Sequence, residues 1–158
     1  MFREVRRFKQ RLNRDECLEI LKQTKRGILS VNGDEGYPYG VPLNHYYDEE
    51  TGKIYFHGAS RGHKVDSIRK DDRVSFCVYD DGYRKEGDWA LTFRSVIVFG
   101  RIREVEDPDV ILRVCRDLSY KFTSDDDYIE HEIATSGKVV MVHELTIEHI
   151  TGKTIREA

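Results

Sequence analysis

A ten-residue run from Tyr55 to Lys64 (YFHGASRGHK) holds the residue types best suited to chemistry in this sequence. Its apolar, strand-like start leads into glycine and alanine, and Ser60 can then cap a helix whose first free amides begin at Gly62. Free amides at a helix N-terminus, together with the positive end of the helix dipole, suit a phosphate. Arg61 and Lys64 add two cations, so the run predicts a compact anion site. A capped surface helix with solvated basic residues is the alternative.

The segment from Tyr37 to Tyr47 (YPYGVPLNHYY) is expected to be a strand at the edge of a sheet. Alternate residues direct their backbone groups to the same side, and on one side these include Pro38 and Pro42, which have no N–H. That side cannot carry a full ladder, so it faces solvent, another chain or a ligand. Gly40 would let a flat ring approach the backbone, and Asn44 could bond the polar rim of the ring. An ordinary edge strand protected by prolines is the alternative.

The histidines, acidic residues and cysteines give weaker signals. The six histidines contain no H-x-x-x-H pair, and His143 and His149 share a strand face only if that strand is regular. The acidic run 125–127 fits a helix cap better than a cation site. The three cysteines contain no Cys-x-x-Cys pair and are expected to be small buried side chains. We therefore expect no metal site.

Length and composition indicate one globular chain. With 158 residues, the chain can bury one core without disulfides, so we expect a single domain over 1–158, with 1–12 as an N-terminal arm. The net charge of −3 gives no support to nucleic-acid binding. No stretch approaches 18 apolar residues, so neither a signal peptide nor a membrane span is expected. Together with the few, widely spaced cysteines, this predicts a cytoplasmic protein.

The hydrophobic pattern predicts a mainly β, antiparallel, six-stranded barrel with flanking α-helices. Strands are expected at 27–32, 37–47, 53–58, 73–79, 89–105 and 138–151, the first three as consecutive antiparallel neighbours. Helices are expected at 14–26, at 60–70, from 108 to 122 and within 123–137. In the long fifth strand, a period of two puts one set of side chains on a single face: Trp89, Leu91, Phe93, Ser95, Ile97 and Phe99.

Four motifs, taken in their order along the chain, resemble a known family. They are Tyr-Pro-x-x-x-Pro-Leu-Asn on the second strand, Tyr-Phe-His-Gly-Ala-x-x-Gly-x-Lys after the third, Asp-Asp-Arg-Val-Ser-Phe, and the run 94–101 (RSVIVFGR) on the long strand. Over roughly residues 14–150, the chain is similar to the pyridoxamine 5'-phosphate oxidase-related flavin-binding proteins. Within them it most resembles the nitroimidazole-resistance (Nim) subgroup.

The resemblance implies a split β-barrel homodimer with FMN at the subunit interface. Lys64 and Arg61 would hold the FMN phosphate, with Ser60 beside them. His57 would lie next to the flavin and is the candidate catalytic residue, as a proton donor or an orienting group. Ser95 would approach the cofactor from the fifth strand. The other residues that the resemblance places along the ring or the ribityl chain are Gly40, Val41, Pro42, Leu43, Asn44, Gly58 and Ala59.

By the same resemblance, the protein would be an oxidoreductase that reduces small oxidised or nitro-aromatic molecules. The extra strand-end residues with which true pyridoxamine phosphate oxidases hold pyridoxal phosphate have no recognisable counterpart in this sequence. The alternative function is a non-catalytic carrier or sensor of a flavin, haem or another planar ligand, since the family also has members that prefer haem or a deazaflavin.

Overall fold

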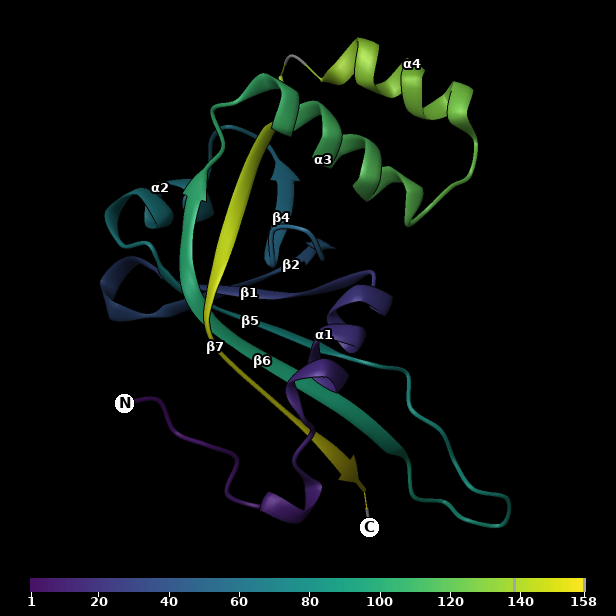
Figure 1. Ribbon diagram of the computed structural model, residues 1–158. Helices are drawn as coiled ribbons and strands as arrows, with labels where there is room; N and C mark the ends of the chain where they lie inside the picture. Colours follow the sequence, from purple (N-terminus) through teal and green to yellow (C-terminus); the bar gives the residue numbers. More distant parts are fainter. Residues whose placement is uncertain (138, 158) are drawn as a thin grey trace.

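Seven antiparallel strands form one curled sheet in the computed structural model, which describes residues 1–137 and 139–157 (Figure 1). Across the sheet the strands follow the order β2-β1-β5-β6-β7-β4-β3. Their bounds are Arg26–Asn32 (β1), Pro38–Asn44 (β2), Tyr46–Asp48 (β3), Lys53–Gly58 (β4), Arg73–Tyr79 (β5), Thr92–Glu104 (β6) and Met141–Arg156 (β7). The predicted class, a mainly β antiparallel split barrel, is confirmed, with seven strands instead of six. Lys138, predicted to open the last strand, lies outside the described residues.

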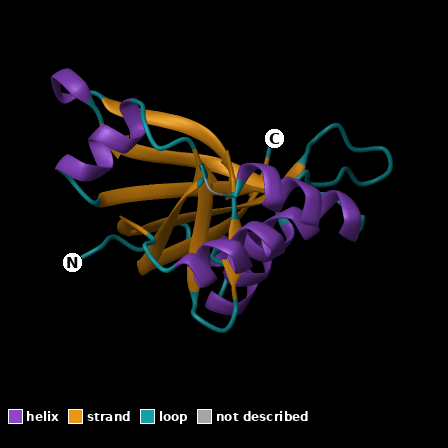
Figure 2. Ribbon diagram, turned by 90° about the horizontal axis from the view of Figure 1, so that it is seen from above, coloured by secondary structure: helices purple, strands orange, loops and turns teal. Residues whose placement is uncertain are grey.

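Helices pack beside the sheet (Figure 2). They are α1 (Arg14–Gln23), α2 (His63–Lys70), α3 (Pro108–Tyr120) and α4 (Asp126–Ser136). Asn13 and Glu16 form a capping box at the start of α1, and the Asn13 Oδ1 accepts a hydrogen bond from the Glu16 amide at 2.9 Å. The acidic run 125–127 caps α4, as expected, because the Asp125 side chain accepts from the Tyr128 amide. The first helix is shorter than predicted, since Arg26 already pairs in β1.

The segment predicted as one strand over 37–47 forms two strands on opposite edges of the sheet. β2 pairs with β1, whereas β3 pairs with β4, so the prediction that the first three strands are consecutive neighbours is wrong. The break lies at His45, which is fully buried and whose Nε2 lies 2.7 Å from the Leu21 carbonyl. The His45 carbonyl accepts from the Lys121 Nζ at 2.6 Å. The His45 carbonyl is therefore bonded by a side chain at the point where the chain passes from β2, at one edge of the sheet, to β3, at the opposite edge.

The long strand β6 alternates as predicted, but the aromatic face is the outer one. Val96, Val98 and Ile102 face the core and are 0–2% exposed. Ile97 and Phe99 are 40% and 38% exposed on the other face. The predicted first residues of the strand, 89 to 91, belong to the preceding loop, because β6 begins only at Thr92.

The main core lies between the inner face of the sheet and α1. Its members include Cys17, Ile20 and Leu21 of α1 and the fully buried Leu29 and Phe76 of the sheet. A second, smaller cluster lies under α3 and contains Tyr55, Val114 and Val142. The sheet thereby keeps one face covered by helices and leaves the other, called the outer face below, partly open.

The remaining sequence predictions concern the cysteines and the arm. Cys17 is buried, whereas Cys77 and Cys115 are half-buried, and all three are free thiols. The N-terminal arm runs along the outer face, where Phe2 stacks on His149 with ring centroids 5.0 Å apart. In the described part of the chain, no helix is both long and apolar enough to cross a membrane.

Candidate functional site

The turn from β4 to α2 exposes free amides, although its cap differs from the one predicted. The N-cap of α2 is Gly62 and not Ser60, and no side chain caps the helix. Gly62 has φ of 132°, a conformation that favours glycine, so the chain can enter the helix there. The first intrahelical bond runs from the Asp66 amide to the Gly62 carbonyl at 3.0 Å. The amides of residues 63–65 therefore have no intrahelical partner and are available to an anion.

The Lys64 ammonium lies against the end of β4. A Cβ added at Gly58 would come within 3.2 Å of the Lys64 Nζ, so the glycine leaves the room that this side chain occupies. Lys64 is half-buried, and burial lowers its pKa. Within residues 1–137 and 139–157, neither Lys64 nor the exposed Arg61 forms an ion pair. Both cations are thus free to bind an anion from outside the chain.

His57 lies on β4 immediately before this turn. Its side chain is exposed in the single chain, and it pairs in register with Val142 of β7. Surrounding protein, and then the charge of Lys64, lowers the pKa of His57 below its usual value. The imidazole is therefore neutral at pH 7, a form that can accept a hydrogen bond at one nitrogen and donate at the other. Ala59 and Ser60, which follow in the turn, are exposed.

A stacked pair of rings joins the two segments that the sequence singled out. The Tyr39 ring of β2 stacks on the His63 imidazole at the start of α2, with centroids 4.2 Å apart. The His63 Nε2 also accepts from the Asp34 amide at 3.4 Å, just before β2. The anion site and the proline-bearing strand are therefore adjacent in space.

The strand β2 is an edge strand, as its prolines predicted, because it pairs with β1 on one side and stands last in the sheet (Figure 1). Val41 and Leu43 pack against the main core. Gly40 and Pro42 lie on the opposite, exposed side. The resemblance assigns residues 40–44 to the flavin ring. In the structure their backbone forms the free edge of the sheet, and only every second side chain points outward.

Gly40 and Asn44 determine which groups β2 can present to a ligand. A Cβ at Gly40 would come within 3.2 Å of Ile28, so any larger residue would be crowded there. The Asn44 Oδ1 accepts from the Arg26 Nε at 3.2 Å, which leaves the Asn44 amide hydrogens available.

Within one chain, Ser95 lies far from Lys64 and Arg61. It lies near the start of β6, while α2 packs near the strand's other end, where the Arg69 Nε donates to Glu104 at 2.7 Å. The strand from Ser95 to Glu104 spans on the order of 30 Å at about 3.3 Å per residue. Ser95 shares the outer face with Ile97 and Phe99, with which it alternates along β6, and it lies far from Lys64 and Arg61 of its own chain.

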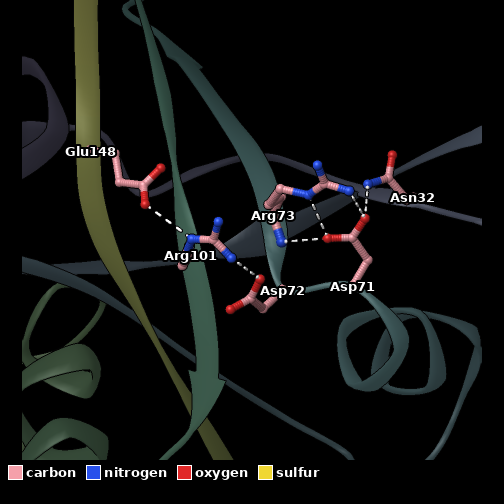
Figure 3. A network of polar contacts seen from close by, with 6 residues as sticks. All are labelled: Asn32, Asp71, Asp72, Arg73, Arg101 and Glu148. Carbon is pink, nitrogen blue, oxygen red and sulfur yellow. Dashed lines mark hydrogen bonds and ion pairs between the residues drawn. The ribbon is translucent and has the colours of Figure 1, made fainter.

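A polar network fixes the end of α2 to the sheet (Figure 3). Asp71, the C-cap of α2, accepts from the Arg73 guanidinium at 2.6 and 2.9 Å and from the Asn32 amide at 2.9 Å. These hydrogen bonds hold the pKa of Asp71 far below its usual range. Arg101 continues the network with Asp72 at 2.7 Å and Glu148 at 3.1 Å. The helix that carries Lys64 is thereby held at its far end by β1 and β5.

Sequence reasoning missed two residues of this region, Tyr39 and His143. The signal for Tyr39 was its place between the two prolines. His143 and His149 share no face, because a register shift at Phe99 and Gly100 makes the strand pairing irregular. His143 is 3% exposed on the inner side, whereas His149 stacks on Phe2 outside.

Metal-binding clusters are not found in the parts of the chain that the structure describes. No group of three or more histidine, cysteine, aspartate or glutamate residues there has the spacing to hold an ion. The free cations and amides of the turn can bind an anion, and the edge of β2 lies beside them.

Several solved structures share this fold. A protein from Bacteroides thetaiotaomicron named for 5-nitroimidazole antibiotic resistance has a TM-score of 0.75 and 18% identity, with 92% of this chain and 87% of that chain covered. An FAD-binding protein from Mesorhizobium loti has a TM-score of 0.70 and 23% identity, with 92% and 97% covered. The flavocytochrome Anf3 from Azotobacter vinelandii has a TM-score of 0.71 and 20% identity, with 96% and 72% covered.

The comparison with curated proteins finds no match. The family model described as pyridoxamine 5'-phosphate oxidase matches residues 13–154. Since this match spans nearly the whole chain and agrees with the resemblance carried by the motifs, the chain belongs to the pyridoxamine 5'-phosphate oxidase family.

Proposed function

We propose that this protein binds FMN and is a flavin-dependent oxidoreductase for small oxidised molecules, nitro-aromatic compounds among them. The observation that carries the proposal is the Lys64 ammonium, which lies over Gly58 beside the free amides of α2. A half-buried cation without a carboxylate partner in the described chain favours an anionic ligand. The phosphate of FMN has the charge and the acceptor oxygens that this arrangement suits.

The edge strand β2 would bind the ring end of the ligand, opposite the phosphate. Because the rings of Tyr39 and His63 hold β2 beside α2, a ligand anchored at Lys64 can extend along the backbone from Gly40 to Asn44. That edge offers amides and carbonyls to the polar rim of a flavin ring, and Gly40 offers no side chain to block it. A bound flavin would supply the electron transfer, and the protein residues would set its position and exclude competing groups.

We further propose that the working unit is a homodimer formed through the outer face. Ile28, Ile97 and Tyr79 are 40%, 40% and 66% exposed there, which is unusual for neighbouring apolar side chains of a sheet. Ser95 lies on this face, too far from its own Lys64 to share a ligand with it. A two-fold axis through the outer face would instead bring Ser95 toward the site of the partner, in keeping with the interface site that the resemblance implies.

His57 is the candidate catalytic residue of this proposal. As a neutral imidazole beside Lys64, it can donate a hydrogen bond to a group on the substrate or orient it above the ring. An anion bound at Lys64 would offset the charge that lowers the pKa of His57, and so would favour the protonated form needed to donate a proton.

Relatives of the same fold support the flavin. The protein from Mesorhizobium loti is named as FAD-binding, Anf3 as a flavocytochrome, and the protein from Bacteroides thetaiotaomicron for nitroimidazole resistance. Two of these names refer to a flavin and the third to resistance against nitroimidazoles, which are nitro-aromatic compounds, and this agrees with the class of reaction proposed.

The deciding experiment is the visible absorption spectrum of the purified protein, followed by thermal melting with saturating FMN. We expect bound-flavin bands and a rise in melting temperature, since a ligand that binds only the native state stabilises it. No bound flavin and no change in melting temperature would overturn the proposal.

The second candidate is a non-catalytic carrier, which the exposed, open form of the site in the single chain favours. Anaerobic turnover of a nitroimidazole with a reduced nicotinamide separates the two. Turnover that falls in a His57→Phe variant would support the enzyme, whereas flavin binding without turnover by any donor would support the carrier. A Soret band in the isolated protein would point to haem instead.

A further inference from the structure

A buried histidine under the Lys64 cluster has no part in the function proposed above. His143 of β7 is 3% exposed, and its Nε2 is buried without a hydrogen-bond partner in the described chain. Leaving such an atom unpaired destabilises the folded state, and native proteins rarely tolerate it without a reason. The position of this atom therefore calls for a partner.

The strand register places His143 one step from the glycine over which Lys64 lies. β4 and β7 pair Phe56 with His143 and Gly58 with Met141. Since paired and alternate residues share a face, His143 and Gly58 are diagonal neighbours on the side that faces α2, with Cα atoms about 7–8 Å apart. The Lys64 Nζ occupies the space above Gly58 on that same side.

The charged groups around His143 come from each element packed against it. Lys64 and Arg69 belong to α2, and Glu104, which pairs with Arg69 at 2.7 Å, lies opposite His143 on β6. On β4, His57 adjoins the same ammonium. Burial, followed by the charge of Lys64, lowers the pKa of His143 to about 4. At pH 7 His143 is therefore a neutral acceptor beside a cation.

We propose that His143 positions the Lys64 ammonium when the ligand binds: the two groups share no hydrogen bond in the unliganded chain, and a shift of the flexible Lys64 side chain lets the His143 Nε2 accept one while the remaining donors of Lys64 point at the phosphate of the flavin. This inference rests on the proposed function. An ammonium has three donors, so two stay available to the phosphate. Because the buried Nε2 gains its partner only in the bound state, this hydrogen bond adds to the affinity for the ligand. His143 does not itself touch the flavin; it acts through Lys64.

The test compares FMN with riboflavin, which has the same ring and no phosphate. His143→Phe fills the space without an acceptor, and we expect it to weaken FMN binding about tenfold, the loss of one hydrogen bond, with riboflavin binding unchanged. His143→Gln retains an acceptor and should restore most of the FMN affinity. In a Lys64→Ala background, His143→Phe should have no further effect, because the residue acts through that lysine.

Each other outcome has a distinct meaning. Equal losses for FMN and riboflavin would reduce His143 to a packing role and overturn the inference, as would unchanged FMN affinity in His143→Phe. If the wild-type protein bound FMN no more tightly than riboflavin, the phosphate site of the proposed function would fail, and the inference with it.

A measurement on the wild-type protein keeps the inference testable even if His143→Phe does not fold. In the FMN-bound protein, the ¹⁵N shift of the His143 Nε2 should be that of an unprotonated, hydrogen-bonded nitrogen, and the hydrogen-bonded character should be lost in Lys64→Ala. His131, which is exposed on α4, is the control and should not change. A proton resident on the Nε2 of His143 at pH 7 would overturn the inference.

Discussion

The His63 imidazole stacks on the Tyr39 ring with centroids 4.2 Å apart and planes inclined by 25°. This contact joins the start of α2 to the edge strand β2, two segments that no hydrogen-bonded strand ladder connects. Together with the Asp71 network at the other end of α2, it holds the cationic turn beside the flat backbone edge. The geometry of the candidate ligand site therefore depends on this pair of rings.

Removal of the stack should weaken both stability and ligand binding. In Tyr39→Leu we expect the free energy of unfolding to fall by about 0.5–1.5 kcal/mol, the usual worth of an aromatic pair. FMN affinity should fall several-fold, because α2 loses its contact with β2. Urea unfolding and fluorescence titration measure the two effects. Tyr37→Leu is the control, since Tyr37 is 75% exposed and should change neither quantity; equal effects of the two variants would contradict the role given to the stack.

Lys64→Ala should weaken FMN binding about tenfold to a hundredfold, the range of a charge-assisted hydrogen bond, and leave riboflavin binding unchanged. The matched control is Lys70→Ala on the same helix. Lys70 is exposed and lies 3.5 Å from Asp34, so its loss should not affect either ligand. Unchanged FMN affinity in Lys64→Ala would place the phosphate elsewhere.

The stability of the protein should fall in mild acid because of His45. Burial, followed by the charge of Lys121, lowers the pKa of His45 to about 3, whereas the unfolded chain has its ordinary value of about 6.5. The unfolded state therefore binds more protons between these values, and stability is lost as the pH falls from 6.5 to 3. The loss is on the order of 5 kcal/mol for this group.

Urea midpoints measured across that pH range test the acid effect. His45→Gln should flatten the dependence, although it also lowers stability at pH 7 because the bond to Leu21 changes. His131→Gln, at an exposed position on α4, should leave the slope as in the wild type. A slope that His45→Gln does not alter would assign the acid effect to other groups.

A charge on the outer face should separate the proposed dimer. Ile97→Lys places an ammonium among apolar side chains that two copies would bury, so we expect monomers in sedimentation velocity and a parallel loss of FMN. Leu112→Lys on α3 is the matched control, because Leu112 is 38% exposed and Ile97 is 40% exposed. A wild-type protein that is monomeric at micromolar concentration would contradict the dimer, and so would an Ile97→Lys variant that still dimerises.

Local patterns were enough to predict most elements. The capping residues of α1, the proline at the first turn of α3, the strand 73–79 and the alternation of β6 are encoded in neighbouring residues, and all are found in the structure. The free cations and the glycine beside them were also readable, because anion sites of this kind are built from one continuous turn.

Contacts between distant residues could not be read in the same way. The sequence placed the first three strands side by side, but burial of His45 and the bond from Lys121 to its carbonyl send β2 and β3 to opposite edges. The sequence predicted Ser60 as the N-cap of α2, but the N-cap is Gly62, because the turn needs a positive φ there. The strand order and the position of this cap depend on contacts that form only in the folded protein.

The sequence by itself determined that a cationic, glycine-bearing turn and a proline-bearing edge strand exist in one β-rich chain. Only the tertiary structure decided that Tyr39 and His63 bring them together, that His143 lies buried beside Lys64, and that Ser95 lies at the other end of β6. The physical reason is that spacing along the chain fixes local dihedral preferences and side-chain periodicity, whereas strand order, register shifts and burial are set by packing among residues far apart in sequence.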